Sequence, residues 1–171
     1  MTRQAAHNSF QDFVSYFPPA ELPLTVQYND LHSYAKTNDP LPDTFLADYL
    51  LPYLDFEVDE FTEFLPCFQI YGTEQNIQLV FWTGRLMHYA FYLITYEKSG
   101  RFVDLAEIAG FYSDRQEVFQ RMAHLNEDSE VYIVETNLST NEKQIVTDQT
   151  KKWVLNILPD GHIQKMQIES I

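Results

Sequence analysis

Histidine is the first residue type to test for chemistry, because imidazole groups bind metals and transfer protons near neutral pH. The five histidines are His7, His32, His88, His124 and His162. They lie in separate segments, and no H-x-H, HExxH or C-x-x-C spacing brings two potential ligands together. We therefore predict no metal site and no cofactor from these residues.

The single cysteine, Cys67, stands between Pro66 and Phe68 in an apolar run. Burial there would raise the pKa of the thiol and make the side chain a small hydrophobic group rather than a nucleophile. No G-x-S-x-G elbow, phosphate-binding glycine loop or dinucleotide fingerprint occurs in the sequence. We name no catalytic residue, and we expect binding rather than catalysis.

The densest group of carboxylates lies in residues 55–63. Its acidic members are Asp55, Glu57, Asp59, Glu60 and Glu63, and they are interleaved with Phe56, Val58 and Phe61. The stretch lacks the glycine and the alternating ligands of a calcium loop, so a solvated loop or helix start is the favoured interpretation. Paired carboxylates for a hydrolase would have to face each other across a cleft, which a linear sequence does not define.

Three aromatic residues, Trp82, Tyr92 and Tyr96, are the candidate ligand-binding residues. On one interpretation they line one face of the central strands and present a stacking surface to a small apolar ligand. On the other they fill the interface between the sheet and the helices. An eight-stranded barrel would favour the ligand, because such a barrel can enclose one small molecule.

The charge of the chain limits its partners. With 25 acidic and 11 basic residues, the 171-residue chain has a formal net charge of −14. Nucleic acid and anionic lipid are attracted to Lys and Arg, so both are excluded as partners, whereas a basic protein is compatible. Solubility alone also explains such acidity. No apolar segment is long enough to span a bilayer and no signal peptide is visible, so we predict a cytoplasmic protein as the sequence stands.

The stretch that organises the fold runs from His88 to Tyr112 and predicts a β-hairpin. The break at Lys98-Ser99-Gly100 contains a glycine that can take the positive φ of a tight turn. The first arm, residues 88–97, is apolar in both phases of a strand, which is typical of a strand covered on both sides. The second arm changes phase, which predicts a bulge near Ala106-Glu107.

The segments before the hairpin are predicted from the spacing of apolar residues and from prolines. Residues 9–17 predict a helix ended by Pro18-Pro19, and residues 43–50 predict a second helix ended by Pro52. Residues 29–43 predict a loop, and residues 21–28 an extended segment or edge strand.

The remaining pattern is that of an antiparallel meander. Its predicted strands are residues 64–71, 77–83, 88–97, 101–111, 129–136, 143–147, 151–158 and 162–169. Residues 114–124 fit either a capped helix or a further strand, and the strands on both sides favour a strand. We predict one α+β domain, with a helical or extended part at 1–62 and a meander at 63–171, in which short helices pack on one face of about seven or eight strands that could curl toward a barrel.

The hairpin sequence TYEKSGRFVDLAEIAG, NEDSEVYIVET at 126–136 and LPDGHI near the end resemble small uncharacterised bacterial proteins, often lipoproteins, that combine N-terminal helices with an antiparallel meander. The resemblance implies this fold and assigns no site.

These observations favour a non-catalytic protein-binding or inhibitor-like module with an acidic surface. The first alternative is a barrel that binds a small apolar ligand, and the second is a hydrolase with a carboxylate or histidine site. An acidic patch centred on an exposed aromatic residue would distinguish the first function from the other two.

Overall fold

The structure is a computed structural model that describes residues 3–70, 75–138 and 150–168. Its helical segments are α1 (Arg3–Val14), α2 (Leu31–Thr37) and α3 (Asp43–Phe45), with 3₁₀ turns at Tyr28–Asp30 and Leu51–Tyr53 and a π-helical stretch at Leu46–Leu50. Its strands are β1 (Pro19–Ala20), β2 (Leu24–Val26), β3 (Glu63–Ile70), β4 (Ile77–Arg85), β5 (His88–Tyr96), β6 (Phe102–Ser113), β7 (Val118–Leu125), β8 (Glu130–Asn137), β9 (Lys151–Ile157) and β10 (Ile163–Ile168).

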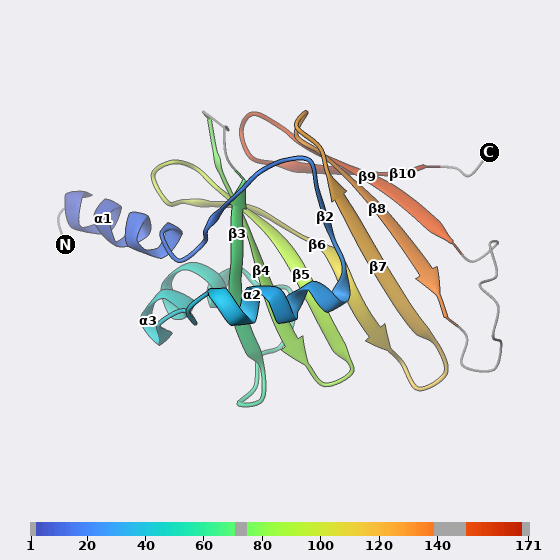
Figure 1. The fold of residues 1–171 in the computed structure, drawn as a ribbon. Coiled ribbons are helices and arrows are strands. Elements are labelled where there is room, and N and C mark those ends of the chain that lie inside the picture. Colours follow the sequence, from blue (N-terminus) through green and yellow to red (C-terminus); the bar gives the residue numbers. More distant parts are fainter. Residues whose placement is uncertain (1–2, 71–74, 139–149, 169–171) are drawn as a thin grey trace.

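All ten strands belong to one open sheet with the order β1-β3-β4-β5-β6-β7-β8-β9-β10 (Figure 1). Neighbours are antiparallel except β1 and β3, and β2 pairs with β7 outside this order. The α+β class and the antiparallel meander are confirmed. The predicted number of strands was too low, because β1 and β2 from the N-terminal part join the sheet, and the sheet does not close into a barrel.

The predicted hairpin is strands β5 and β6. Gly100 in its turn has φ 97°, as the turn requires. In β5, Phe91 and Leu93 belong to one buried cluster and Ile94 belongs to the other, so the strand is covered on both faces. The register skips Ile108, which places the bulge beside the predicted pair Ala106-Glu107.

Helices pack on both faces of the sheet, which corrects the prediction of one face. Phe10 and Phe13 of α1 are buried against one face, together with Leu50 of the π-helical stretch. Leu31 and Tyr34 of α2 pack on the opposite face. The predicted loop at 29–43 therefore contains a helix, because Leu31 and Tyr34, three residues apart, lie on one side of it and cover the sheet.

The other predicted elements agree with the structure in type and differ at their ends. The first helix begins at Arg3 and ends at Val14, and the second is a short irregular run from Asp43 to Tyr53 that includes Pro52. Residues 118–125 form strand β7, so the preference for a strand was correct, whereas Asp114 accepts hydrogen bonds from the backbone of Gln116 and Glu117 in a turn. The predicted strand at 143–147 lies outside the described residues.

Candidate functional site

The structure does not bring the three predicted aromatic residues together. Trp82 is buried on the face covered by α2, whereas Tyr92 and Tyr96 are buried on the opposite face with α1. The ring of Trp82 stacks on Tyr89 at 6.1 Å between centroids. The hydroxyl of Tyr96 donates a hydrogen bond to the backbone carbonyl of Tyr49, and burial raises the pKa of Tyr96 well above its usual value. These rings pack the two interfaces between sheet and helices.

Five charged or polar side chains, one from each of five consecutive strands, instead form a continuous network. Its members are Arg85 on β4, His88 on β5, Glu107 on β6, Arg121 on β7 and Glu135 on β8. We call this group the five-strand network. Cross-strand pairing places Arg85 opposite His88 and Arg121 opposite Glu135, and Glu107 joins these two pairs.

The contacts of His88 define the roles of its two ring nitrogens. Arg85 Nη2 lies 2.8 Å from His88 Nδ1, and since a guanidinium can only donate, Nδ1 accepts. His88 Nε2 then carries the proton and donates to Glu107 Oε1 at 2.7 Å. The two contacts therefore define which ring nitrogen accepts and which donates, and they fix the orientation of the imidazole ring between Arg85 and Glu107.

Arg121 lies between two carboxylates. Its Nη1 is 3.1 Å from Glu107 Oε2, and its Nε donates to Glu135 Oε2 at 2.9 Å, with a second bond from Nη2. The Arg121 side chain is 16% exposed and that of Glu135 6%, so this charge group is largely removed from water. Burial alone would lower the pKa of Arg121, but Glu107 and Glu135 outweigh it and raise that pKa.

The position of Arg121 follows from a division in the sheet. Strands β6 and β7 pair only from Gly110 to Ser113, and Gly110 is opposite Arg121. Beyond that point β2 takes the place of β6 beside β7, with Val26 opposite Ala123. The bulge at Ile108 lies at the same place. Glu107 of β6 can therefore reach across the separation to Arg121.

Stability should depend on pH through Glu107. Burial would raise the pKa of its carboxyl, but the hydrogen bond from His88 and the charge of Arg121 outweigh burial and lower the pKa. A carboxyl with a lowered pKa stabilises the fold above its unfolded pKa of about 4.3, and this contribution is lost as the pH falls through the folded pKa. We expect Glu107→Gln to lower the free energy of unfolding by about 2 kcal/mol at pH 7 and by much less at pH 3.

Urea denaturation at pH 3 to 7 measures this dependence. Glu97→Gln is the control, because Glu97 forms an exposed ion pair with Arg101 on the surface. The control should change the free energy of unfolding little at any pH. An equal, pH-independent loss in the two variants would contradict the assigned role of Glu107.

The five-strand network also holds an acidic loop in place. The guanidinium of Arg85 lies 3.9 Å above the ring of Phe56, a cation–π contact. Within the loop, Asp59 Oδ1 accepts hydrogen bonds from the Phe61 amide and the Thr62 hydroxyl. The acidic loop, residues 55–63, is therefore an ordered turn.

Large apolar side chains of the acidic loop point into solvent. Phe61 is 78% exposed and Val58 41%. The carboxylate residues of the loop are all exposed as well: Asp55, Glu57, Asp59, Glu60 and Glu63. The loop therefore presents an acidic surface with an exposed aromatic residue within it.

The turn between β4 and β5 adds two more exposed apolar residues at the same end of the sheet. Leu86 is 92% exposed and Met87 48%. Glu63 pairs with Gly84, so the acidic loop and this turn emerge together (Figure 1). Met87 has φ 63°, a backbone conformation that favours glycine. A strained turn that exposes Leu and Met is costly for stability alone, which is typical of a contact site.

Acidic residues are concentrated in the part of the sequence that contains the acidic loop. Residues 37–84 contain nine of the 25 acidic residues and none of the 11 Lys and Arg. Arg85, the first basic residue after this stretch, is engaged with His88 and Phe56. The acidic loop therefore lies in a stretch of sequence that supplies carboxylates and no Lys or Arg.

Two hollows are candidate ligand sites, and neither contains the predicted aromatic residues. One of about 380 Å³ adjoins the five-strand network, and its lining includes Asp104, Glu107, Arg121, Leu155 and Lys165. Both carboxylate oxygens of Asp104 already accept backbone hydrogen bonds, from Leu105 and Ile163. Mixed, paired charges of this kind do not select a ligand class.

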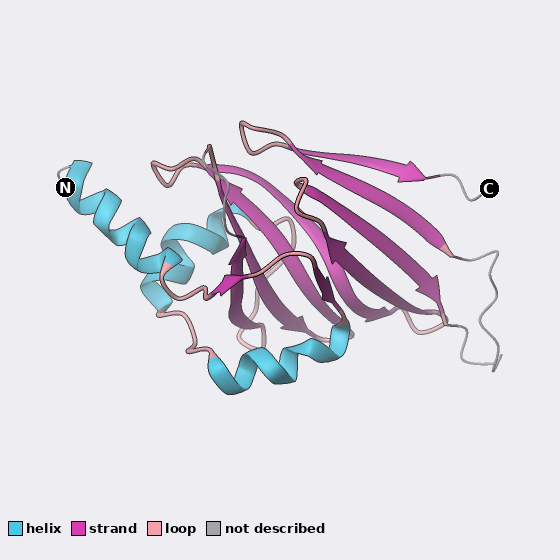
Figure 2. Cartoon of the chain, turned by 45° about the horizontal axis from the view of Figure 1, so that its top comes forward, coloured by secondary structure: helices cyan, strands magenta, loops and turns pink. Residues whose placement is uncertain are grey.

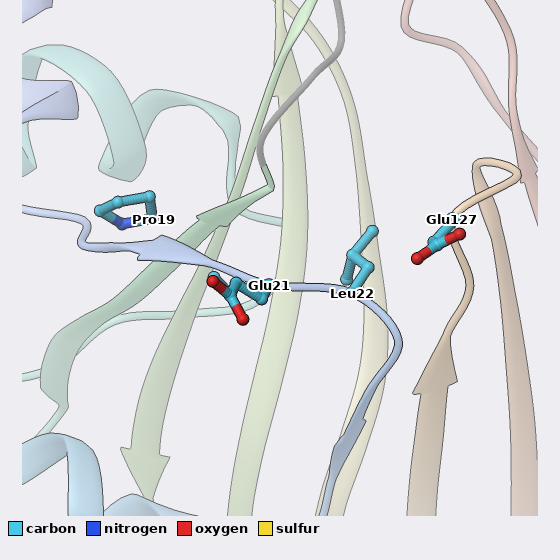
Figure 3. A pocket seen from close by; sticks show the side chains of 5 residues that line it. Pro19, Glu21, Leu22 and Glu127 are labelled. Atoms are coloured by element: carbon cyan, nitrogen blue, oxygen red, sulfur yellow. The ribbon is translucent and has the colours of Figure 1, made fainter.

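The second hollow has a volume of about 560 Å³ and lies beside β1. Figure 3 shows its carboxylates, Glu21 and Glu127, on either side of Leu22 rather than converging on one point. Within the described residues, no three His, Cys, Asp or Glu side chains form a group that could hold a metal ion. No described helix is long and apolar enough to cross a membrane.

Sequence reasoning identified the acidic residues 55–63 but missed the five-strand network. A signal was present, because Glu107, Arg121 and Glu135 lie inside strand sequences in which most residues are apolar or uncharged. A charge in the interior of a buried strand needs a partner on a neighbouring strand. Which of these charges lie next to each other follows only from the order of the strands in the sheet.

The chain matches no family model, and no curated protein and no solved structure matches it significantly. The resemblance to small bacterial meander proteins stays a prediction.

Proposed function

We propose that the protein is a non-catalytic binding module whose acidic loop and β4–β5 turn contact a basic protein partner. The observation that supports this most directly is the exposure of Phe61 among five exposed carboxylates. Leu86 and Met87 extend the apolar part of the same surface. An aromatic anchor with a charged surround is the common arrangement of an energetically important contact.

The charge of the surface defines the chemistry of the partner. Carboxylates at the rim attract Lys and Arg and raise the rate of encounter, while the apolar side chains supply the area removed from water. The partner surface should therefore combine basic residues with an apolar pocket for Phe61. The five-strand network supports this function by fixing Arg85, and through it Phe56, before the partner arrives. A preordered loop loses less conformational entropy on binding.

A displayed library of random twelve-residue peptides tests the proposal. Selection on the immobilised protein should enrich sequences that contain both Lys or Arg and large apolar residues. We expect Phe61→Ser to weaken the best peptide about 30-fold, which corresponds to about 2 kcal/mol for the loss of a central aromatic contact. Removing three rim charges with Glu57→Gln, Glu60→Gln and Glu63→Gln should weaken it about tenfold and reduce the dependence of binding on salt.

The matched control removes the same charge from another part of the surface. Glu117→Gln, Glu127→Gln and Asp128→Asn change three exposed carboxylates around β7. Asp59 is kept in both variants because it accepts the hydrogen bonds that shape the loop. Equal weakening by the two triple variants, or enrichment of peptides without basic residues, would refute the proposed surface.

A further inference from the structure

The outer face of strands β7 to β10 is a second apolar surface, distinct from the acidic loop. The inner face of β7–β9 is buried in the core with α2, as Ile133 and Leu155 show, whereas β10 is exposed on both faces after Ile163. The side chains of the outer face alternate with these along each strand. Among the described residues, the helices lie over the β3–β6 half of the sheet (Figure 2).

Cross-strand pairing aligns the outer-face residues in two adjacent rows. One row is His124, Tyr132, Val154 and Met166, and the other is Met122, Val134, Lys152 and Ile168. Met166 is 56% exposed, and Met122, Tyr132 and Ile168 are each 39% exposed. Val134 is half-buried and Val154 is buried between them. The solvated face of an antiparallel sheet is normally polar, so four exposed apolar side chains in two adjacent rows are unusual.

The charge of this face points to its occupant. Its charged side chains on the four strands are Glu130 and Lys152, so the face is neutral in a chain with a net charge of −14. The carboxylate of Glu130 also accepts a hydrogen bond from the Tyr132 hydroxyl. A basic partner finds no attraction here, and one lysine does not bind a polyanion. A second copy of the same face meets an apolar surface without charge repulsion at the contact.

We propose that two copies of the chain associate through the outer faces of β7–β10, packed sheet on sheet about a twofold axis. A twofold contact uses the same patch twice, so a self-neutral apolar patch is suited to it. Four strands spaced about 4.8 Å apart form a small footprint, near the lower limit for specific interfaces. The dimer should therefore dissociate in the micromolar range, and it leaves the acidic loop free.

Sedimentation velocity of the full chain from 1 to 200 µM tests the dimer. The unaltered protein should shift from monomer to dimer across this range. Met166→Glu puts a carboxylate in the middle of the patch and should raise the dissociation constant at least tenfold. Gln167→Glu adds the same charge one residue along β10, on the opposite face, and should change the constant less than twofold.

Three results would overturn the proposal. One is a monomer at every concentration. Another is an equal effect of Met166→Glu and Gln167→Glu, which would indicate pairing along the edge of β10. The third is dissociation by Leu86→Glu with no effect of Met166→Glu, which would place self-association at the β4–β5 turn. Circular dichroism of each variant checks that the fold is retained.

Discussion

Replacing Arg121 with Met should lower the free energy of unfolding by about 3–5 kcal/mol at pH 7, because it leaves two carboxylates buried without a counter-charge. Glu107 and Glu135 both contact the guanidinium, and Arg121 also lies 5.9 Å from the centres of the Tyr112 and Trp153 rings. Methionine keeps much of the packing volume but none of the charge. The loss should shrink in acid, since protonation removes the charge of the orphaned Glu107 carboxylate, whose pKa Arg121 helps to lower.

Arg101→Met is the matched control for this prediction. Arg101 also forms an ion pair with a glutamate, Glu97, but its side chain is 77% exposed. Solvent-exposed pairs contribute about 0–1 kcal/mol, so the control should stay close to the unaltered protein. Chemical denaturation at pH 4 and pH 7 measures both variants. Similar losses in the two, or a loss that grows in acid, would rule out the buried charge as the cause.

Replacing Gly110 with Ala should destabilise the protein by about 3 kcal/mol or more, since a strained backbone and a steric collision add together. Gly110 has φ 147°, outside the region that other residues adopt. A Cβ atom there would lie 2.2 Å from the backbone oxygen of Tyr89. This glycine also ends the pairing of β6 with β7 and lies opposite Arg121, so the collision would disturb the part of the sheet that brings Arg121 within reach of Glu107.

Gly161→Ala separates the two contributions. Gly161 has φ 95°, but a Cβ atom there would approach only the side chain of Val103, at 3.3 Å. The control should lose about 1 kcal/mol from backbone strain alone. Thermal unfolding of both variants gives the comparison. If Gly110→Ala were no worse than Gly161→Ala, the close approach of β5 to β6 at Tyr89 would be wrong.

The local parts of the fold were predictable from sequence because their signals are short. Gly100 marks the central turn, and the two apolar phases of β5 predict burial on both faces. Helix α2 was missed because Asn38, Asp39 and Pro40 dominate the composition of its surroundings, while two apolar residues, Leu31 and Tyr34, are enough to attach it to the sheet. Tertiary packing decided this segment against its local preference.

The candidate site was predictable only in part for the same reason. The acidic loop is contiguous in sequence, so its charge and its aromatic residues could be recognised directly. The exposure of Phe61 could not be predicted, because the side chain of a phenylalanine among carboxylates can be either buried or exposed to solvent. Glu107 and Glu135 are 28 residues apart, and their common contact with Arg121 depends on the separation of β6 from β7.

The pairing of β2 with β7 has a consequence for how the chain acquires its structure. Thr25 is opposite His124, 99 residues later, and their side chains are 3.0 Å apart. During synthesis β2 must wait until β7 has left the ribosome before the two strands can pair. Contacts so distant in sequence slow folding, because a long loop must close first. Until β7 is available, Val26 lacks the neighbouring strand beside which it is buried, and exposed apolar surface of this kind favours aggregation.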